Sequence, residues 1–425
     1  MASTVRIDGS LPDPGDSSTI GLAFAGNWGV QYDWALDRAA ATNQPRRLSA
    51  IGFPPPFDSD LEGALRGRAA FASFLYLFKN GRYLRLNAAT MIPDGPDAVT
   101  AGAWGLPADW TSFDAVLPGR GAKIEFCYFF RGRQYIRFDW AKNAPSSGYP
   151  KFIGPEWHMA TPFERDIDGV LAGQGGSFGT KGYLFKSLPQ TVDQNGNVVP
   201  ASTPGAIAVV TPGYARYDYT AEASDGTETA PLDVVPPWSG FLSLLDAGAA
   251  IDRALNWCDA ALAALATPAD PAVAAALGHH FRSSSPDPAR LTQIIDRMAK
   301  VRARIASLPD RFQWTSGFGG VAQTTPNILT EIGDNFSILH GPNGRAAVMI
   351  YEAVHFIFVP GDIVIDVPEF SGATVGGVTF GVSGGMAYDA MAVDQAIANP
   401  SSYAAFAQEI FFGSDERFGN ARRQL

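Results

Sequence analysis

Two kinds of hydrophobic spacing divide the chain near residue 248. Before this point, aromatic and aliphatic residues alternate with polar ones in short runs around a Gly-containing turn, as in Tyr76–Arg85 and Tyr128–Arg137. A period of two on both sides of a tight turn predicts β-hairpins. After this point, apolar residues recur every three or four positions in 249–266 and 291–308, which predicts two helices, each ending near a proline.

The β-rich part is built from repeats. The pattern apolar, acidic, small, apolar, apolar, any, Gly occurs at Leu61–Gly67, Phe113–Gly119 and Ile167–Gly173, and more weakly at Ile20–Gly26 and Leu242–Gly248. The three strong copies follow one another at nearly equal intervals. The next interval is longer, and its surplus falls in the turn-rich segment 187–212, which predicts an insertion protruding as a loop. A period of about 50 residues with several short strands is typical of propeller blades.

The hairpins also carry a family resemblance. Tyr128-Phe-Phe-Arg-Gly-Arg-Gln-Tyr-Ile-Arg137, followed by Gly148-Tyr-Pro-Lys-Phe-Ile153 and Trp157, resembles the hemopexin-like repeat. The resemblance covers about 18–248 and implies an all-β, four-bladed propeller, with residues 1–17 as an N-terminal extension. In this family the start of each blade faces an axial channel that often holds an ion.

Acidic residues stand at the start of the three strong copies: Glu62, Asp114 and Asp168. Because hard cations favour oxygen ligands, these carboxylates are candidates for holding a structural cation in the propeller channel. The alternative is that each carboxylate caps a short turn. Both interpretations stay open at this point.

A second candidate site lies in the helical part. Short strands are expected around 312–314, 328–332 and 336–339, ahead of a third helix that contains Ala346–Phe356. In the zinc motif His-Glu-x-x-His, two imidazoles share one helical face and the Glu acts on metal-bound water. Here Tyr351 takes the first histidine position, while Glu352 and His355 remain.

Together with Tyr388 and the later run Asn399-Pro-Ser-Ser-Tyr-Ala-Ala-Phe-Ala, this order resembles the deuterolysin and lysine-specific metallo-endopeptidase (aspzincin) family. The resemblance covers about 249–412 and implies an α+β, mostly helical zincin-like domain, which we assign to 249–425. It also implies roles for three residues: Glu352 as general base, His355 as second zinc ligand and Tyr388 as oxyanion stabiliser.

Two of the three zinc ligands implied by this resemblance are missing, because Tyr351 and Gly385 stand where the family has His and Asp. A catalytic zinc typically needs three protein ligands and an open position, so we expect no zinc here. Asp366 and Glu369 follow the helix and offer an alternative metal site with Tyr351 and His355. Without a metal, the same side chains would line a ligand-binding cleft.

We therefore expect a recognition protein in which a propeller is fused to a pseudo-metallopeptidase. The resemblance of the two domains to these families also implies a role in a toxin or in interaction with a host. Two alternatives stay open: an active metallopeptidase with zinc in a non-standard site, and a metal-free enzyme that uses Glu352, His355 and Tyr388 on a small molecule. The sequence does not identify the ligand, whether protein or small molecule.

Charge and composition exclude several classes of protein. The formal charge of −10, from 42 acidic and 32 basic residues, argues against nucleic-acid binding. No apolar run is long enough for a transmembrane helix. The segment Met1–Gly15 is polar and acidic rather than a secretory signal, so we expect a cytoplasmic protein or export by a leaderless route. Cys127 and Cys258 are the two cysteines, which excludes a disulfide scaffold and a cysteine-based zinc site.

Overall fold

The computed structural model describes residues 7–12, 19–40, 45–159, 161–192, 199–204, 206–229, 232, 238–315, 318, 321–326, 328–333, 336, 341–358, 364–368, 374–375, 378–379 and 386–415. The chain forms two compact units. The N-terminal unit comprises Ser3–Asp193 and Asn197–Leu245, and Asp246–Leu425 makes up most of the C-terminal unit. The first is β-rich and the second is mostly helical, as the two kinds of hydrophobic spacing predict.

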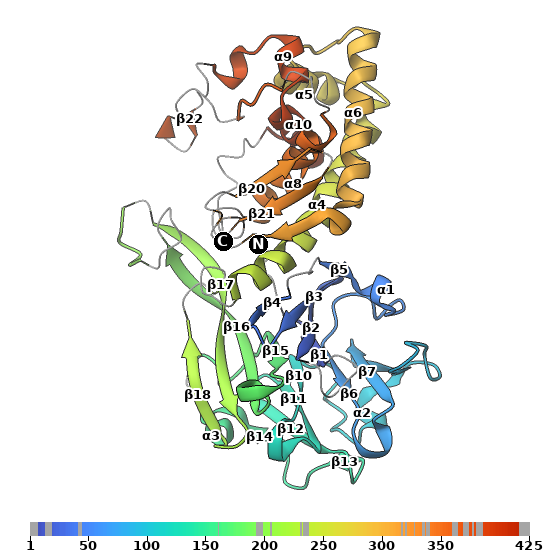
Figure 1. The fold of residues 1–425 in the computed structure, drawn as a ribbon, viewed down its shortest axis with the longest axis vertical. Helices are drawn as coiled ribbons and strands as arrows, with labels where there is room; N and C mark the ends of the chain where they lie inside the picture. Colours follow the sequence, from blue (N-terminus) through green and yellow to red (C-terminus); the bar gives the residue numbers. More distant parts are fainter. Residues whose placement is uncertain are drawn as a thin grey trace. The chain divides into compact units, whose positions relative to one another are not determined.

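Four antiparallel sheets form most of the described part of the N-terminal unit (Figure 1). The first contains β1 (Gly9–Pro12), β2 (Ile20–Ala25), β3 (Trp28–Asp33), β4 (Arg38–Ala39) and β5 (Arg46–Arg47). The second contains β6 (Gly63–Arg66), β7 (Phe74–Lys79), β8 (Arg82–Asn87) and β9 (Ala98–Val99). The third contains β10 (Ala115–Pro118), β11 (Phe126–Arg131), β12 (Gln134–Asp139), β13 (Ala144–Pro145) and β14 (Lys151–Phe152). The fourth contains β15 (Gly169–Ala172), β16 (Lys181–Val192), β17 (Ile207–Asp218) and β18 (Ala223–Glu228).

The opening strands of the four sheets form a closed ring. Strand β1 contacts β6, β6 contacts β10, β10 contacts β15, and β15 returns to β1. Figure 1 shows these four strands gathered in the middle of the unit, with the later strands of each sheet outside them. The aromatic hairpins are present as predicted, with Tyr76 opposite Arg85 and Phe129 opposite Ile136.

The repeat pattern begins earlier than the sequence analysis places it. The weak copy assigned to Ile20–Gly26 is the second strand of the first sheet, and the one assigned to Leu242–Gly248 lies inside a helix. The opening strand β1 is preceded by Ile7-Asp8, and the interval from Ile7 to Leu61 equals the interval from Phe113 to Ile167. The expected N-terminal extension 1–17 therefore contains the opening strand of the first sheet.

The expected loop at 187–212 is wrong at both of its ends, because residues 187–192 and 207–212 are strand. Strands β16 and β17 continue through it as one antiparallel ladder, from Lys181 opposite Asp218 to Val192 opposite Ile207. The β-branched residues on both sides of the segment favour this extension, while the turn-forming residues are concentrated between the two strands. The insertion is thus a lengthened hairpin of the fourth sheet.

Aromatic side chains fill the spaces between neighbouring sheets. Short helices bring one large ring into each of two junctions: Trp104 follows α2 (Thr100–Ala103), and Trp157 ends α3 (Ile153–Trp157). Helix α1 (Leu48–Ile51) occupies the junction of the first and second sheets. At the last junction, Trp238 stacks on Tyr32 of the first sheet, with centroids 5.3 Å apart, and contacts Tyr183 of the fourth.

Trp238 opens the long helix α4 (Trp238–Leu265), so the first two turns of α4 belong to the N-terminal unit. The C-terminal unit continues with α5 (Pro271–Phe281), α6 (Pro288–Ala306), β19 (Phe312–Trp314), β20 (Ala322–Thr325), β21 (Leu329–Ile332), α8 (Pro342–Ile357), β22 (Thr374–Val375), β23 (Val378–Thr379), α9 (Val393–Ile397) and α10 (Pro400–Phe412). Short 3-10 turns lie at Leu308–Arg311 and Tyr388–Ala390. No described helix is long and apolar enough to cross a membrane.

Helix α8 is the centre of the C-terminal unit, because it packs on α6, α10 and β20. Strand β20 belongs to a three-stranded sheet of order β19-β21-β20. The predicted helices and the strand at 312–314 are present, and the strand expected at 328–332 is β21. Helix α5 and strand β20 were not predicted. In the segment expected as a strand at 336–339, the described residue Phe336 is helical, and 337–339 lie outside the described residues.

Candidate functional site

Helix α8 carries Glu352 on its buried side. This residue is 5% exposed, on a helix that packs on α6, α10 and β20. Burial raises the pKa of Glu352 to about 7, with a hydrogen bond from Thr324 acting in the opposite direction and Asp366 adding to the increase. Near neutral pH this carboxyl group therefore exists in both protonated and ionised forms.

Tyr351, His355 and Asp366 form a cluster beside Glu352. The Tyr351 hydroxyl donates a hydrogen bond to Asp366 Oδ1. The rings of Tyr351 and His355 are in edge contact, with centroids 4.7 Å apart. Burial lowers the pKa of His355, and the nearby carboxylate of Asp366 partly counters this effect, so the imidazole tends to be neutral. The structure thus brings together four of the predicted cleft residues.

The segment that carries Asp366 is held by a buried asparagine. Asn399, at the start of α10, accepts from the Val367 N–H at 3.1 Å and donates to the Val367 carbonyl at 2.9 Å. The Ile365 N–H also donates to the Ala398 carbonyl. The Asn-Pro-Ser-Ser-Tyr run therefore has a physical role: its first residue fixes the backbone beside Asp366.

Among the described residues, Glu352, His355 and Asp366 do not bring three ligand atoms within 4.8 Å of one another. Glu369 and Gly385, the other positions that the sequence analysis considers, lie outside the described residues.

Tyr388 belongs to a second cluster. Its side chain is fully buried, and its hydroxyl lies 3.0 Å from Nδ1 of His280. Arg282 donates to the Tyr388 carbonyl at 2.7 Å, and its guanidinium lies 4.7 Å from the ring centroid. The structure thus places the tyrosine hydroxyl against a histidine of α5, which the sequence analysis did not consider.

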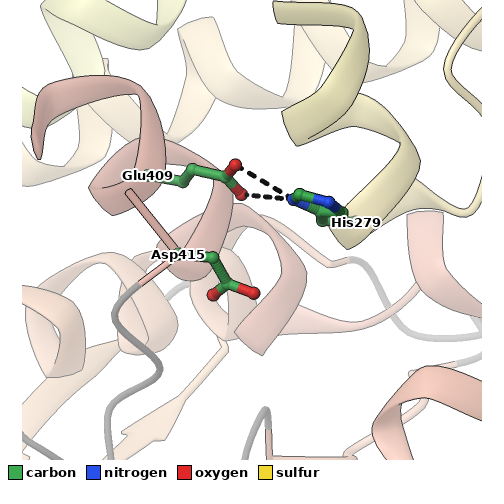
Figure 2. A group of neighbouring side chains, drawn as sticks. All are labelled: His279, Glu409 and Asp415. Atoms are coloured by element: carbon green, nitrogen blue, oxygen red, sulfur yellow. Dashed lines mark hydrogen bonds and ion pairs between the residues drawn. The ribbon is translucent and has the colours of Figure 1, made fainter. Parts of the chain in front are cut away.

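The second cluster extends to the ends of two helices. His279 and His280 lie in the last turn of α5, Glu409 lies in the last turn of α10, and Asp415 follows that helix. Figure 2 shows His279, Glu409 and Asp415. The adjacent histidines were the signal that sequence reasoning missed, because a search for histidines four positions apart on one helix passes over them. Their carboxylate partners come from a distant part of the sequence, so no local pattern joins the two pairs.

The acidic residues at the start of the propeller repeats contact backbone amides. Asp114 Oδ2 accepts from the Gly132 N–H at 2.5 Å, and Asp168 Oδ2 accepts from the Ser187 N–H. Asp8 makes the equivalent contact in the first sheet, with the Gly26 N–H at 2.7 Å. Each of these carboxylates thus binds the backbone of the hairpin in its own sheet, 18 or 19 residues further along the chain. Among the described residues, Glu62, Asp114 and Asp168 do not converge on a common point as ligands.

No family model and no curated protein sequence matches the chain. Among solved structures, it is similar to the hemopexin fold protein CP4 from cow pea, with 19% identity, 52% of this chain and 96% of that chain covered, and a TM-score of 0.36. A plant lectin with two metal binding sites from Cicer arietinum shares 16% identity, with coverages of 55% and 96% and a TM-score of 0.40. A zinc peptidase from Grifola frondosa shares 18% identity, with coverages of 39% and 93% and a TM-score of 0.30. The structural neighbours thus include both hemopexin-fold proteins and a zinc peptidase.

Proposed function

We propose that this chain is a recognition protein, in which a four-bladed hemopexin-like propeller is joined to a zincin-like unit that holds no catalytic zinc. The observation that carries the proposal is the hydrogen bond between Tyr351 and Asp366. At the position of the first zinc ligand, this hydroxyl is engaged by a carboxylate of the same cleft. Of the two histidines of the His-Glu-x-x-His motif, this chain keeps His355 alone. A single imidazole does not hold a catalytic zinc.

The cleft offers hydrogen bonds rather than metal chemistry. A carboxyl group with a pKa of about 7, an imidazole with a lowered pKa and a tyrosine hydroxyl lie together on and beside α8. Such groups donate to and accept from uncharged polar partners. We assign the cleft to a ligand that presents neutral hydrogen-bonding groups, such as the amides of a peptide.

The test combines metal analysis with peptidase assays on the purified full chain. Peptidase activity should stay at background, and neither a chelator nor Glu352→Gln should change it. Zinc content should be the same in the wild type and in His355→Ala. Chelator-sensitive proteolysis abolished by Glu352→Gln, or zinc that is lost in His355→Ala, would show an active metal site and refute the proposal.

A second candidate function is metal-free acid–base catalysis, favoured by the raised pKa of Glu352. It predicts a different result in a screen of small-molecule hydrolysis or isomerisation. Activity would disappear in Glu352→Gln but would persist in the presence of a chelator.

A further inference from the structure

The ends of α5 and α10 bring metal-ligating side chains together, outside the Glu352 cleft. Nδ1 of His279 lies 3.0 and 3.1 Å from the two carboxylate oxygens of Glu409. His279, Glu409 and Asp415 each offer one ligand atom, and these atoms all lie within 4.8 Å of one another (Figure 2). Two ligands of a tetrahedral zinc, each about 2.1 Å from the metal, are about 3.4 Å apart. Small side-chain rotations therefore suffice to close the three groups around an ion.

The cluster is accessible from one side and supported from the other. The His279 side chain is 50% exposed, so an ion can enter from solvent, whereas the Glu409 side chain is 11% exposed.

His280 holds the ligand carboxylate in place. Its Nε2 lies 2.7 Å from Glu409 Oε2, and its side chain is fully buried. When Glu409 is ionised its oxygens can only accept, so Nε2–H of a neutral His280 donates to Glu409 and Nδ1 accepts from the Tyr388 hydroxyl. This chain of hydrogen bonds from tyrosine to histidine to glutamate is the kind of outer support that orients metal ligands in proteins.

We propose that His279, Glu409 and Asp415 form a binding site for a divalent transition metal, with Zn²⁺ as the ion that suits one imidazole and two carboxylates. His280 and Tyr388 act as positioning residues. Bound zinc would link the end of α10 to the end of α5. This site is separate from the cleft of the proposed function, which involves Glu352 and His355.

The experiment is a zinc titration of the chelator-treated full chain, in competition with a fluorescent zinc indicator. The wild type should bind about one Zn²⁺. His279→Ala and Asp415→Asn, which change side chains that are at least partly exposed, should each weaken the affinity at least about tenfold. His355→Ala is the matched control, because it removes the histidine of the other cluster, and it should bind zinc as the wild type does. Circular dichroism establishes that each variant is folded.

Three results would overturn the proposal: no zinc binding by the wild type at submillimolar concentrations, unchanged affinity in both His279→Ala and Asp415→Asn, or a loss of binding in His355→Ala alone. The last result would instead place zinc in the cleft and refute the proposed function. A loss in His279→Ala with no change in His355→Ala supports the new site and leaves the proposed function intact.

Discussion

At the scale of single residues, the main electrostatic feature is that no cationic side chain among the described residues pairs with the buried Glu352. Helical periodicity predicts that Glu352 and His355 lie on neighbouring parts of one helix, since they are three positions apart. It does not predict that Tyr351 pairs with Asp366, or that His279 and His280 meet Glu409. Those pairs join residues from different elements, and only packing brings them together.

The raised pKa of Glu352 makes stability depend on pH. The folded state keeps the proton up to about pH 7, whereas the unfolded state releases it near the ordinary pKa of 4.5. The folded state therefore binds more protons between these values, so the free energy of unfolding falls as pH rises and levels off above pH 7. The gap between the two pKa values corresponds to about 3 kcal/mol. Glu352→Gln should remove this decrease, as denaturant unfolding at pH 5 and pH 8 will show.

Asp296→Asn provides the control for this measurement, because it removes an exposed carboxylate from α6 that pairs with Lys300. Its unfolding free energy should follow the pH dependence of the wild type. If Glu352→Gln and the wild type have parallel pH profiles, the carboxyl group is ionised in the folded state and the assignment of its environment is wrong.

At the scale of elements, helices with strong periodicity are predictable and those without it are not. Helix α6 has polar and apolar faces that identify it, and Asp287 caps its start by accepting from the N–H groups of Ala289 and Arg290. Helix α5 is rich in alanine, so its apolar face does not stand out from the rest of its sequence. The lengthened hairpin of β16 and β17 was mistaken for a loop because turn-forming residues near its tip dominate the composition of the segment.

A substitution of Asn399 tests whether the start of α10 holds the segment that contains Val367. Replacing it by alanine leaves the buried N–H and C=O of Val367 without their side-chain partners. Leaving one such group unsatisfied costs about 1–3 kcal/mol, so Asn399→Ala should lower the free energy of unfolding by about 3 kcal/mol. Hydrogen exchange at the Val367 amide should accelerate. Asn343→Ala, which removes a partly buried hydrogen bond to Arg253, should leave that amide unchanged. Equal exchange in both variants would show that Asn399 does not hold the segment.

At the scale of the whole chain, the repeat period predicts the sheets. The first copy of the repeat, which closes the ring of opening strands against the fourth sheet, departs from the repeat pattern. Ser10 occupies a position that is apolar in the three strong copies, which is why the first copy is hard to recognise. The structure supplies the reason: Ser10 Oγ accepts from the Ala172 N–H at 3.1 Å, and this buried hydrogen bond joins the first sheet to the fourth. Trp238 completes the same junction from a segment that is helical.

The close approach of β15 to the first sheet allows a test of whether β1 and β15 close the ring of opening strands. A Cβ atom at Gly169 would lie 1.4 Å from the carbonyl oxygen of Ile7, so the backbones must separate to accept one. Since overpacking typically costs about 1–3 kcal/mol and here both sides are backbone, Gly169→Ala should destabilise the N-terminal unit by about 3 kcal/mol. Gly226→Ala, in β18 of the same sheet, is the control, because its nearest neighbour is the end of the Arg216 side chain at 3.5 Å. Thermal unfolding should show a marked decrease in Tm for Gly169→Ala and little change for Gly226→Ala. Equal Tm values would mean that β1 does not close the ring against β15.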